Sequence, residues 1–385
     1  MGKFSYEALV VGCGLSGAVA ARHLAEDCGK RVLVIDRRSH IAGNMYDFKD
    51  ENGILVQLYG PHIFHTKKKE LFDFISKYAD WEHYELTCMA KIDGKFTPSP
   101  FNFQTIDDYY PAEDAAELKR HIKAVYGKAE KTTIVEMLNS TDPVIKQYAQ
   151  FLFDKDYSLY TAKQWGISPS EIDVSVLKRV PVLFSYKIGY FDDEYQVMPK
   201  ESFVAFFEKL LDHKNIEIRL ETDAASFINV ENGTLFLNGE PATIPVIYTG
   251  AIDELLCYKY GKLPYRSLRF EYRTENTDSY QDAPVVAYPQ AEGFTRITEY
   301  TKLPVQKTNG KTKIAVEYPL QYAQNNGSEP YYPILTEESQ KQYAKYRREA
   351  DEIENLFLCG RLADFKYYNM DQALENALQL CERLT

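Results

Sequence analysis

Cysteine and tryptophan are scarce in this chain, which has six cysteines and two tryptophans among 385 residues. No two cysteines form a Cys-x-x-Cys pair, and their spacing to the histidines does not suit a metal site. We therefore expect a cytoplasmic protein without a metal centre, with reduced thiols at Cys13, Cys28, Cys88, Cys257, Cys359 and Cys381.

Long apolar runs and an excess of positive charge are also missing. No uninterrupted apolar stretch approaches the roughly 20 residues that cross a membrane, so we expect no membrane span. The net charge of −11 argues against binding to nucleic acid or to an anionic membrane. A Walker loop, a Gly-x-Ser-x-Gly motif and a Cys-His nucleophile arrangement are absent from the sequence, so hydrolysis and phosphoryl transfer lack their usual residues.

A glycine-rich turn near the N-terminus is the most informative feature that is present. An apolar run leads into Gly12, Gly14 and Gly17, residues with helical spacing follow, and a second apolar run ends at Asp36. The three glycines permit a tight turn, the approach of a pyrophosphate and close helix–strand packing, and the helix N-terminus favours an anion. Asp36 stands where a carboxylate binds an adenosine ribose and repels a 2′-phosphate, which predicts FAD or NAD rather than NADP.

The residues after Asp36 favour a flavin. Arg37 begins a stretch that continues to a small-residue turn at Gly43 and Asn44, through which the backbone can reach the remainder of an FAD. We therefore expect FAD rather than NAD, and we place Ser16, Arg37, Gly43 and Asn44 in the cofactor site.

Periodicity divides the chain into interleaved parts of an α/β protein. Alternation around Asp93-Gly94 predicts a hairpin, helical spacing prevails from about 107 to 163, and alternating segments from 268 to 318 predict an antiparallel sheet. We expect an FAD-binding Rossmann-like domain with an inserted helical domain and an antiparallel β-sheet domain for the substrate. Their predicted bounds are 1–85, 196–250 and 345–385 for the first, 103–170 for the second, and 86–102, 171–195 and 251–344 for the third.

Arginine or tryptophan stands among polar residues at 160–166, 178–182 and 294–300. Taken singly, Trp165 at a helix end would be a core residue, and Arg296 in a strand would be solvated or paired with Glu299. Guanidinium groups bind a diphosphate in a bidentate manner, and an aromatic face suits a uracil ring. These segments would therefore form an anion-binding site if the fold brings them together.

Two histidines, His62 and His65, lie in one short segment and are candidate acid–base groups or polar neighbours of the flavin. We place His62 in the cofactor site and assign His65 to catalysis. A metal site is rejected because the sequence shows no third ligand.

Ten short sequences carry a resemblance to one known family: VVGCGLSGAVAARHLAE (10–26), GN followed by Tyr (43–46), YGPHIFHT (59–66), YTAKQWG (160–166), LKRVPV (177–182), YQVMPK (195–200), FTRITEY (294–300), EYP (317–319), PYYPI (330–334) and GRLADFKYYNMD (360–371). Through them the chain resembles, over nearly its whole length, the bacterial UDP-galactopyranose mutases. These flavoenzymes interconvert UDP-galactopyranose and UDP-galactofuranose.

The resemblance implies residue roles by position. Arg179, on a loop that closes over the substrate, and Arg296 match the two arginines that hold the diphosphate. Further substrate contacts are implied for Tyr160, Thr161, Trp165, Tyr190, Tyr332, Tyr367 and Asn369. Late flavin contacts are implied for Gly360, Arg361, Met370 and Asp371.

The mechanism that the resemblance implies is redox-neutral. N5 of the reduced flavin attacks the anomeric carbon and displaces UDP, and the sugar then recloses through its other hydroxyl. The protein would hold UDP as leaving group and returning nucleophile. An electron donor such as NAD(P)H, a homodimer and a role in cell-surface polysaccharide biosynthesis belong to the same expectation.

Three positions depart from the family pattern. Asn369 replaces an aspartate, and Leu86 and Ala287 replace two asparagines, so tolerance of an N-acetylated sugar such as UDP-N-acetylgalactosamine stays open. Two other functions also stay open. One is a flavin amine oxidase-like oxidoreductase, and the other is a flavin- or nucleotide-sugar-binding protein without catalysis.

Overall fold

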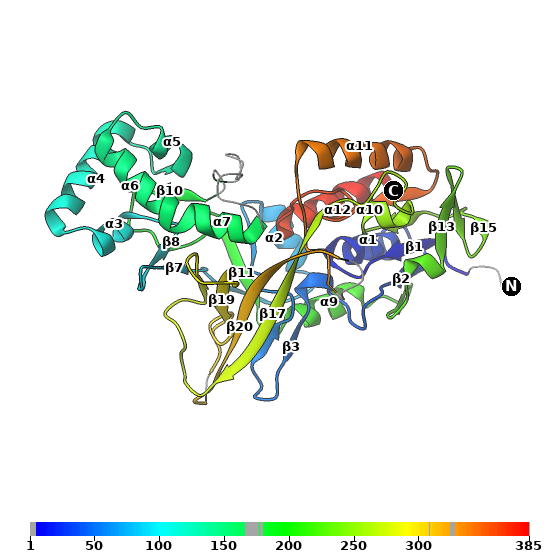
Figure 1. Cartoon of the computed structure of the whole chain (residues 1–385). Helices are drawn as coiled ribbons and strands as arrows, with labels where there is room; N and C mark the ends of the chain where they lie inside the picture. Colours follow the sequence, from blue (N-terminus) through cyan, green and yellow to red (C-terminus); the bar gives the residue numbers. More distant parts are fainter. Residues whose placement is uncertain (1–4, 166–176, 178–179, 308, 324–327, 385) are drawn as a thin grey trace.

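The computed structural model describes residues 5–165, 177, 180–307, 309–323 and 328–384, and it has an elongated outline (Figure 1). A parallel sheet with its helices lies at one end, a helical group lies at the other end, and a long mixed sheet lies between them. Within the described ranges, no helix has both the length and the apolar character needed to cross a membrane.

The parallel sheet has five strands in the order β12-β2-β1-β16-β22. The strands are β12 (Ile216–Arg219), β2 (Val32–Ile35), β1 (Ala8–Val11), β16 (Val246–Tyr248) and β22 (Leu356–Leu358). Every residue of the three central strands is buried, which is typical of a parallel sheet covered on both faces. The predicted Rossmann-like fold is thereby confirmed, and the chain returns to this sheet at 246–248, beside β1.

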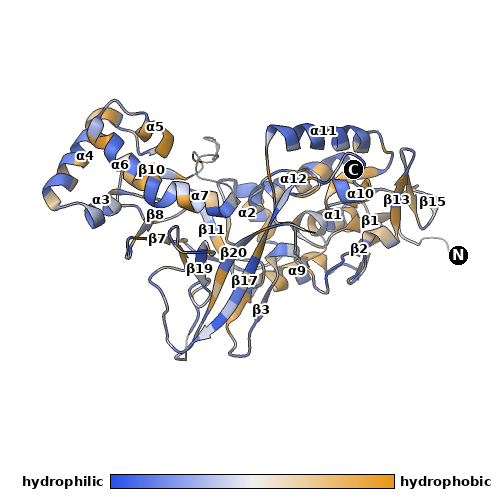
Figure 2. Ribbon diagram, viewed as in Figure 1, coloured by the Kyte–Doolittle hydropathy of each residue, from blue (hydrophilic) through white to orange (hydrophobic). Residues whose placement is uncertain are grey.

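Helices cover both faces of the parallel sheet. On one face lie α1 (Leu15–Glu26), α9 (Phe203–Leu211) and α12 (Met370–Leu384), whose buried residues share a single apolar core. On the other face lie α10 (Ile252–Leu255) and α11 (Glu337–Asp351). Helix α11 is largely hydrophilic along its length (Figure 2). Only a narrow stripe of it, which includes Tyr346 and Ala350, is buried.

The helical group spans residues 103 to 165 and has its own apolar core. It consists of α3 (Phe103–Tyr109), α4 (Ala112–Tyr126), α5 (Ile134–Leu138), α6 (Pro143–Leu152) and α7 (Ser158–Trp165). A short π-helix, η2 (Phe153–Tyr157), joins α6 to α7 without a break. A two-stranded ladder of β9 (Lys131–Thr133) and β10 (Pro181–Leu183) accompanies the group.

The long sheet has seven strands in the order β21-β17-β20-β19-β18-β7-β8. They are β21 (Tyr332–Pro333), β17 (Tyr265–Glu275), β20 (Thr312–Gln321), β19 (Arg296–Glu299), β18 (Val285–Ala287), β7 (Cys88–Ile92) and β8 (Lys95–Ser99). The predicted antiparallel sheet is found in β17, β20, β19 and β18, and one further pair, β7 with β18, runs parallel. These strands are far apart in the sequence, so no tight turn obliges them to run in opposite directions.

Smaller elements complete the fold. One hairpin turns at Asp93-Gly94, as the sequence predicted, and a second turns at Asn232-Gly233, and all four residues have positive φ. The remaining elements are η1 (Gly43–Met45), β3 (Asp47–Lys49), β4 (Leu55–Gln57), β5 (Phe64–Thr66), α2 (Lys69–Ile75), β6 (Trp81–His83), β11 (Tyr195–Pro199), η4 (Ala224–Ser226), β13 (Ile228–Glu231), β14 (Thr234–Leu237) and β15 (Glu240–Pro241). The domain bounds given above stay a prediction.

Asp47 ties the segment after η1 to the start of helix α9. Its buried carboxylate accepts hydrogen bonds from the backbone amides of Phe203 (2.8 Å) and Val204 (2.9 Å). Burial raises the pKa of Asp47 to about 6, and the two amide hydrogen bonds oppose that rise. The same helix has a local N-cap, Ser202, whose hydroxyl accepts from the amide of Ala205.

Substituting Asp47 and Ser202 one at a time compares the long-range hydrogen bonds to the start of α9 with the local N-cap. We expect Asp47→Ala to lower the free energy of unfolding by about 2 kcal/mol, because it leaves two buried amides without their acceptor. Ser202→Ala should cost only about 1 kcal/mol. Urea unfolding at neutral pH measures both, and an Asp47→Ala protein as stable as Ser202→Ala would contradict the assignment.

Candidate cofactor and substrate site

The glycine turn brings three backbone segments unusually close together. A Cβ on Gly12, whose φ is +103°, would lie 2.0 Å from the Thr249 hydroxyl oxygen, and a Cβ on Gly17 would lie 2.0 Å from the Gly12 carbonyl oxygen. Gly14 is the N-cap of α1 and has no side chain with which to cap it. The amides of the first turn therefore point toward the space in front of the helix, where an anion can bind.

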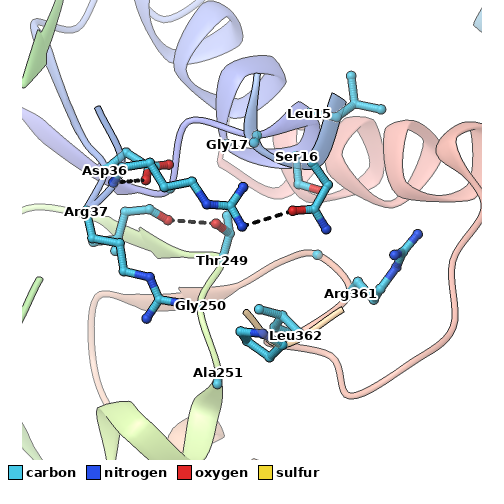
Figure 3. Close-up of a pocket in the computed structure, with 18 of the residues that line it drawn as sticks. Leu15, Ser16, Gly17, Asp36, Arg37, Thr249, Gly250, Ala251, Arg361 and Leu362 are labelled. Atoms are coloured by element: carbon cyan, nitrogen blue, oxygen red, sulfur yellow. Dashed lines mark hydrogen bonds between the residues drawn. The ribbon is translucent and has the colours of Figure 1, made fainter. Parts of the chain in front are cut away.

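A long pocket opens in front of this turn (Figure 3). Asp36 and Arg37 lie at one end of it and Arg361 lies at the other. Twelve of the thirteen residues that the sequence assigned to the cofactor line this pocket: Gly12, Gly14, Ser16, Gly17, Asp36, Arg37, Gly43, Asn44, His62, Gly360, Arg361 and Met370. The thirteenth, Asp371, lies in the first turn of α12 and is not part of the lining.

Close backbone approach also shapes the floor of the pocket. Gly43 has a φ of +53°, and a Cβ there would lie 2.9 Å from the Cα of Gly14. A Cβ on Gly360, whose φ is +103°, would lie 3.3 Å from the Ser16 hydroxyl oxygen. A ligand that lies along these segments meets backbone rather than side chains, which fits the extended pyrophosphate of a dinucleotide.

The Asp36 carboxylate is fixed at the far end of the pocket. It accepts hydrogen bonds from the amides of Cys13 (2.7 Å) and Arg38 (2.9 Å). Each carboxylate oxygen accepts more than one hydrogen bond, so the group can still accept from a ribose hydroxyl while its negative charge repels a phosphate. This geometry fits the adenosine end of FAD.

Sequence reasoning missed an acidic residue at this end. The carboxylate of Glu329 lies 3.0 Å from both Arg37 and Arg38, and Arg38 also donates to the Asn44 side chain at 3.0 Å. Glu329 precedes β21 and is nearly 300 residues from the arginines. No local pattern in the sequence could have indicated this pairing.

The two histidines separate in the structure. His62 lines the pocket, where burial and the charges of Arg361 and Arg296 lower its pKa to about 4, so the ring is neutral at physiological pH. His65 is not part of that lining. Its Nδ1 lies 2.7 Å from the Asp193 carboxylate and its ring stacks on Phe191. Of the two histidines, His62 therefore lines the pocket, and the catalytic role assigned to His65 stays a prediction.

Arg296 begins strand β19 and forms an ion pair with a buried carboxylate. Its Nε and Nη2 lie 2.7 and 2.6 Å from Glu317 Oε2, and the Glu317 side chain is only 2% exposed. Burial alone would lower the pKa of Arg296, but the charge of Glu317 raises it, so the guanidinium stays charged. The alternative partner expected from the sequence, Glu299, instead lies 3.1 Å from Lys302, because it directs its carboxylate to the opposite side of the strand.

Tyrosines and a second arginine gather beside this pair. The rings of Tyr332 and Tyr367 stack at 5.1 Å, and the Arg361 guanidinium lies over both. Burial raises the pKa of Tyr332 and of Tyr160, while the charge of Arg296 opposes the rise at both hydroxyls. Each ring is therefore close to Arg296 and is a neutral hydrogen-bond donor at physiological pH.

The other residues predicted to bind substrate lie at separate places in the chain. Asn369 lines the long pocket, Thr161 is half-buried on α7, and Tyr190 is about one-third exposed beside Phe191. Trp165 ends helix α7. Arg179 lies outside the described residues, so its predicted contact with the diphosphate stays a prediction.

Known proteins match the chain along its whole length. A sequence model of the UDP-galactopyranose mutases matches residues 155–367, and one of NAD(P)-binding Rossmann-like domains matches residues 10–78. The UDP-galactopyranose mutase of Mycoplasma pneumoniae is 33% identical over 99% of this chain and 96% of its own length. The chain belongs to the UDP-galactopyranose mutase family. It is therefore an isomerase of a flavin-dependent family.

Three further comparisons concern a related mutase and the fold. The dTDP-fucopyranose mutase of Escherichia coli is 34% identical over 97% of both chains. A crystal structure of reduced UDP-galactopyranose mutase has a TM-score of 0.74 at 16% identity, covering 99% of this chain and 94% of that one. A redesigned putrescine oxidase shares the fold with a TM-score of 0.53 at 11% identity and 98% coverage of both chains. The predicted fold and family are confirmed.

Gly43 and Gly233 provide a matched test of the flavin pocket. Both have positive φ, a conformation that asparagine tolerates, but a Cβ meets Gly14 at the first position and nothing within 4 Å at the second. We expect Gly43→Asn to be purified with little flavin, and Gly233→Asn to keep the wild-type amount. Absorbance near 450 nm per protein chain measures this, and full flavin content in Gly43→Asn would show that the ligand does not lie along this turn.

Proposed function

We propose that the chain is an FAD-dependent, redox-neutral isomerase that interconverts UDP-galactopyranose and UDP-galactofuranose. The observation that carries the proposal is the continuity of two sites through Arg361. Arg361 lines the dinucleotide pocket at one side of its side chain and lies over Tyr332 and Tyr367 at the other. A flavin in the pocket and a nucleotide sugar among the tyrosines would then share one boundary.

The residues beside that boundary suit a diphosphate that leaves and returns. Arg296 uses two of its five N–H donors on Glu317, and the others can bind phosphate oxygens. The hydroxyls of Tyr160 and Tyr332, neutral because of burial, can donate further hydrogen bonds. These groups would stabilise negative charge on the departing diphosphate and keep it within reach for recombination.

A reduced flavin, when bound, supplies a nucleophilic nitrogen for the anomeric carbon of the sugar. The chain's own residues then need no strong general base. His62, neutral with a pKa of about 4, donates from Nδ1 to the Gly60 carbonyl, so its Nε2 can accept a hydrogen bond at this boundary without carrying a charge. The proposal further includes NAD(P)H as electron donor, a homodimer, a cytoplasmic location and a product used in cell-surface polysaccharide biosynthesis.

Turnover under reducing and oxidising conditions tests this function. We expect purified enzyme with dithionite to convert UDP-galactofuranose to UDP-galactopyranose, and the oxidised enzyme to be inactive. Chromatography of the nucleotide sugars measures the product. Equal activity in both states would contradict the mechanism, and net oxidation of a substrate with release of hydrogen peroxide would instead support an oxidoreductase.

Substitution of Arg296 tests whether this side chain holds the diphosphate. Arg296→Lys keeps a positive charge beside Glu317 but loses the planar fork, so we expect turnover to fall at least about tenfold while the flavin stays bound. Arg269→Lys is the matched control, because Arg269 lies in the same sheet and stacks on Tyr318. Loss of flavin from Arg296→Lys, or turnover unchanged from wild type, would show that Arg296 does not hold the substrate.

A second candidate substrate is a 6-deoxy nucleotide sugar, as in the name of the related dTDP-fucopyranose mutase. Ala287 lies directly opposite Arg296 in the sheet, and Leu86 is buried, so both positions are apolar where the family resemblance predicts asparagine. An apolar position accepts a sugar that lacks a hydroxyl with little loss.

We expect kcat/KM for dTDP-fucopyranose to lie within about tenfold of that for UDP-galactopyranose. Ala287→Asn should shift the preference toward UDP-galactopyranose. A panel that also includes UDP-N-acetylgalactosamine, assayed under reducing conditions, measures these ratios. A strong preference for UDP-galactopyranose that Ala287→Asn leaves unchanged would exclude the second candidate.

A further inference from the structure

One lysine, Lys163 on helix α7, is enclosed by backbone carbonyls. Its ammonium nitrogen donates to the carbonyl oxygens of Tyr288 (2.8 Å) and Phe294 (2.8 Å), and also to that of Ala291. All three carbonyls belong to the loop that joins β18 to β19. An ammonium has three donors, so these three acceptors use all of them.

This bonding excludes a direct role of Lys163 in holding the substrate. A lysine that binds a phosphate needs at least one N–H directed at it, and here each one already has a carbonyl acceptor. When three carbonyls of one loop surround an ammonium group, their hydrogen bonds hold the loop against the side chain that carries the ammonium. Lys163 therefore joins two segments of the chain rather than the chain and a ligand.

The two joined segments carry substrate residues of the proposed function. Tyr160 lies three residues before Lys163, on the same side of α7, and Arg296 lies two residues after Phe294. The charge of Arg296 acts on the Tyr160 hydroxyl, so the two side chains are neighbours. Among the described residues, the hydrogen bonds between the helix and the loop at this place come from the Lys163 ammonium.

We propose that Lys163 is a positioning residue that sets the distance between Tyr160 and Arg296, and through them the grip on the diphosphate. The inference rests on the proposed function. A charged lysine in this half-buried carbonyl cup is costly to replace, because a neutral or shorter side chain leaves the carbonyls without donors. The loop would then move relative to α7, and Arg296 with it.

A double-mutant cycle on UDP affinity tests the inference. We expect Lys163→Met to raise the Kd of UDP about tenfold in the wild-type background, and by less than about threefold in the Arg296→Lys background. Non-additivity of this kind is expected only if Lys163 acts through Arg296. Calorimetry with the flavin-loaded enzyme measures the Kd, and the flavin spectrum reports whether each variant is intact.

Lys155→Met is the matched control, because Lys155 lies on the adjoining π-helix and pairs with Asp93 at the surface. It should bind UDP like the wild type. Lys163→Arg should recover only part of the affinity, because a planar guanidinium cannot direct three N–H groups at three converging carbonyls. If Lys163→Met fails to retain flavin, the cycle is run with Lys163→Arg, which keeps the charge.

The outcomes separate this inference from the proposed function. Failure of the wild-type enzyme to bind UDP would contradict the proposed function itself. Tight UDP binding by the wild type, together with the same Kd for the Lys163 variants, would contradict only the positioning role. Equal effects of the substitution in both backgrounds would also contradict it, because they would indicate a general loss of stability.

Discussion

A buried carboxylate, Glu317, determines where the positive charge of the proposed substrate site can lie. It is 2% exposed and accepts two short hydrogen bonds from Arg296, and its other oxygen accepts from the Thr295 hydroxyl at 3.1 Å. A guanidinium held in this way has few alternative positions, because leaving the carboxylate would strand a buried charge. A chain with a net charge of −11 thus presents a fixed cation at one place, and the rest of the site is arranged around it.

That place is a junction of separate parts of the fold. The arginine comes from the long mixed sheet, Tyr160 from the inserted helical group, and Arg361 from the loop that leads from the parallel sheet to α12. In the proposed function, no single part would hold the substrate alone. Their mutual position depends on contacts between parts, such as the Arg266 guanidinium that donates to the Gln164 carbonyl at the end of α7. Stability and function are therefore coupled at this junction.

Local patterns were sufficient to predict the glycine turn that lines the long pocket. The spacing of Gly12, Gly14 and Gly17 determines which backbone segments can touch, and their crowding in the structure follows from the absence of a Cβ. Helix α9 and the two hairpin turns were predictable for the same reason, since periodicity and turn residues act within a few positions. The resemblance to the mutase family supplied the residues of the substrate side.

Residues that act across the chain could not be found in this way. Glu329, Glu317 and Lys163 gain their roles from partners more than 20 residues away, and an acidic or basic residue in isolation is most often solvated. Arg296 shows the same limit, because its neighbour in the sequence, Glu299, was the obvious partner and the paired strand provided a different one. The parallel pairing of β7 with β18 likewise depends on how distant segments meet.

The shared position of Arg361 has a consequence for the order of events in the site. Its guanidinium donates to the carbonyls of Tyr331 and Tyr368, and it stacks on the two rings of the substrate side. Tyr331 itself lines the dinucleotide pocket. A flavin that fills the pocket would therefore restrain Tyr331 and Arg361, and through them the tyrosines that face the nucleotide sugar in the proposed function. Cofactor binding would in this way preorganise the substrate side, which reduces the entropy lost when the diphosphate binds.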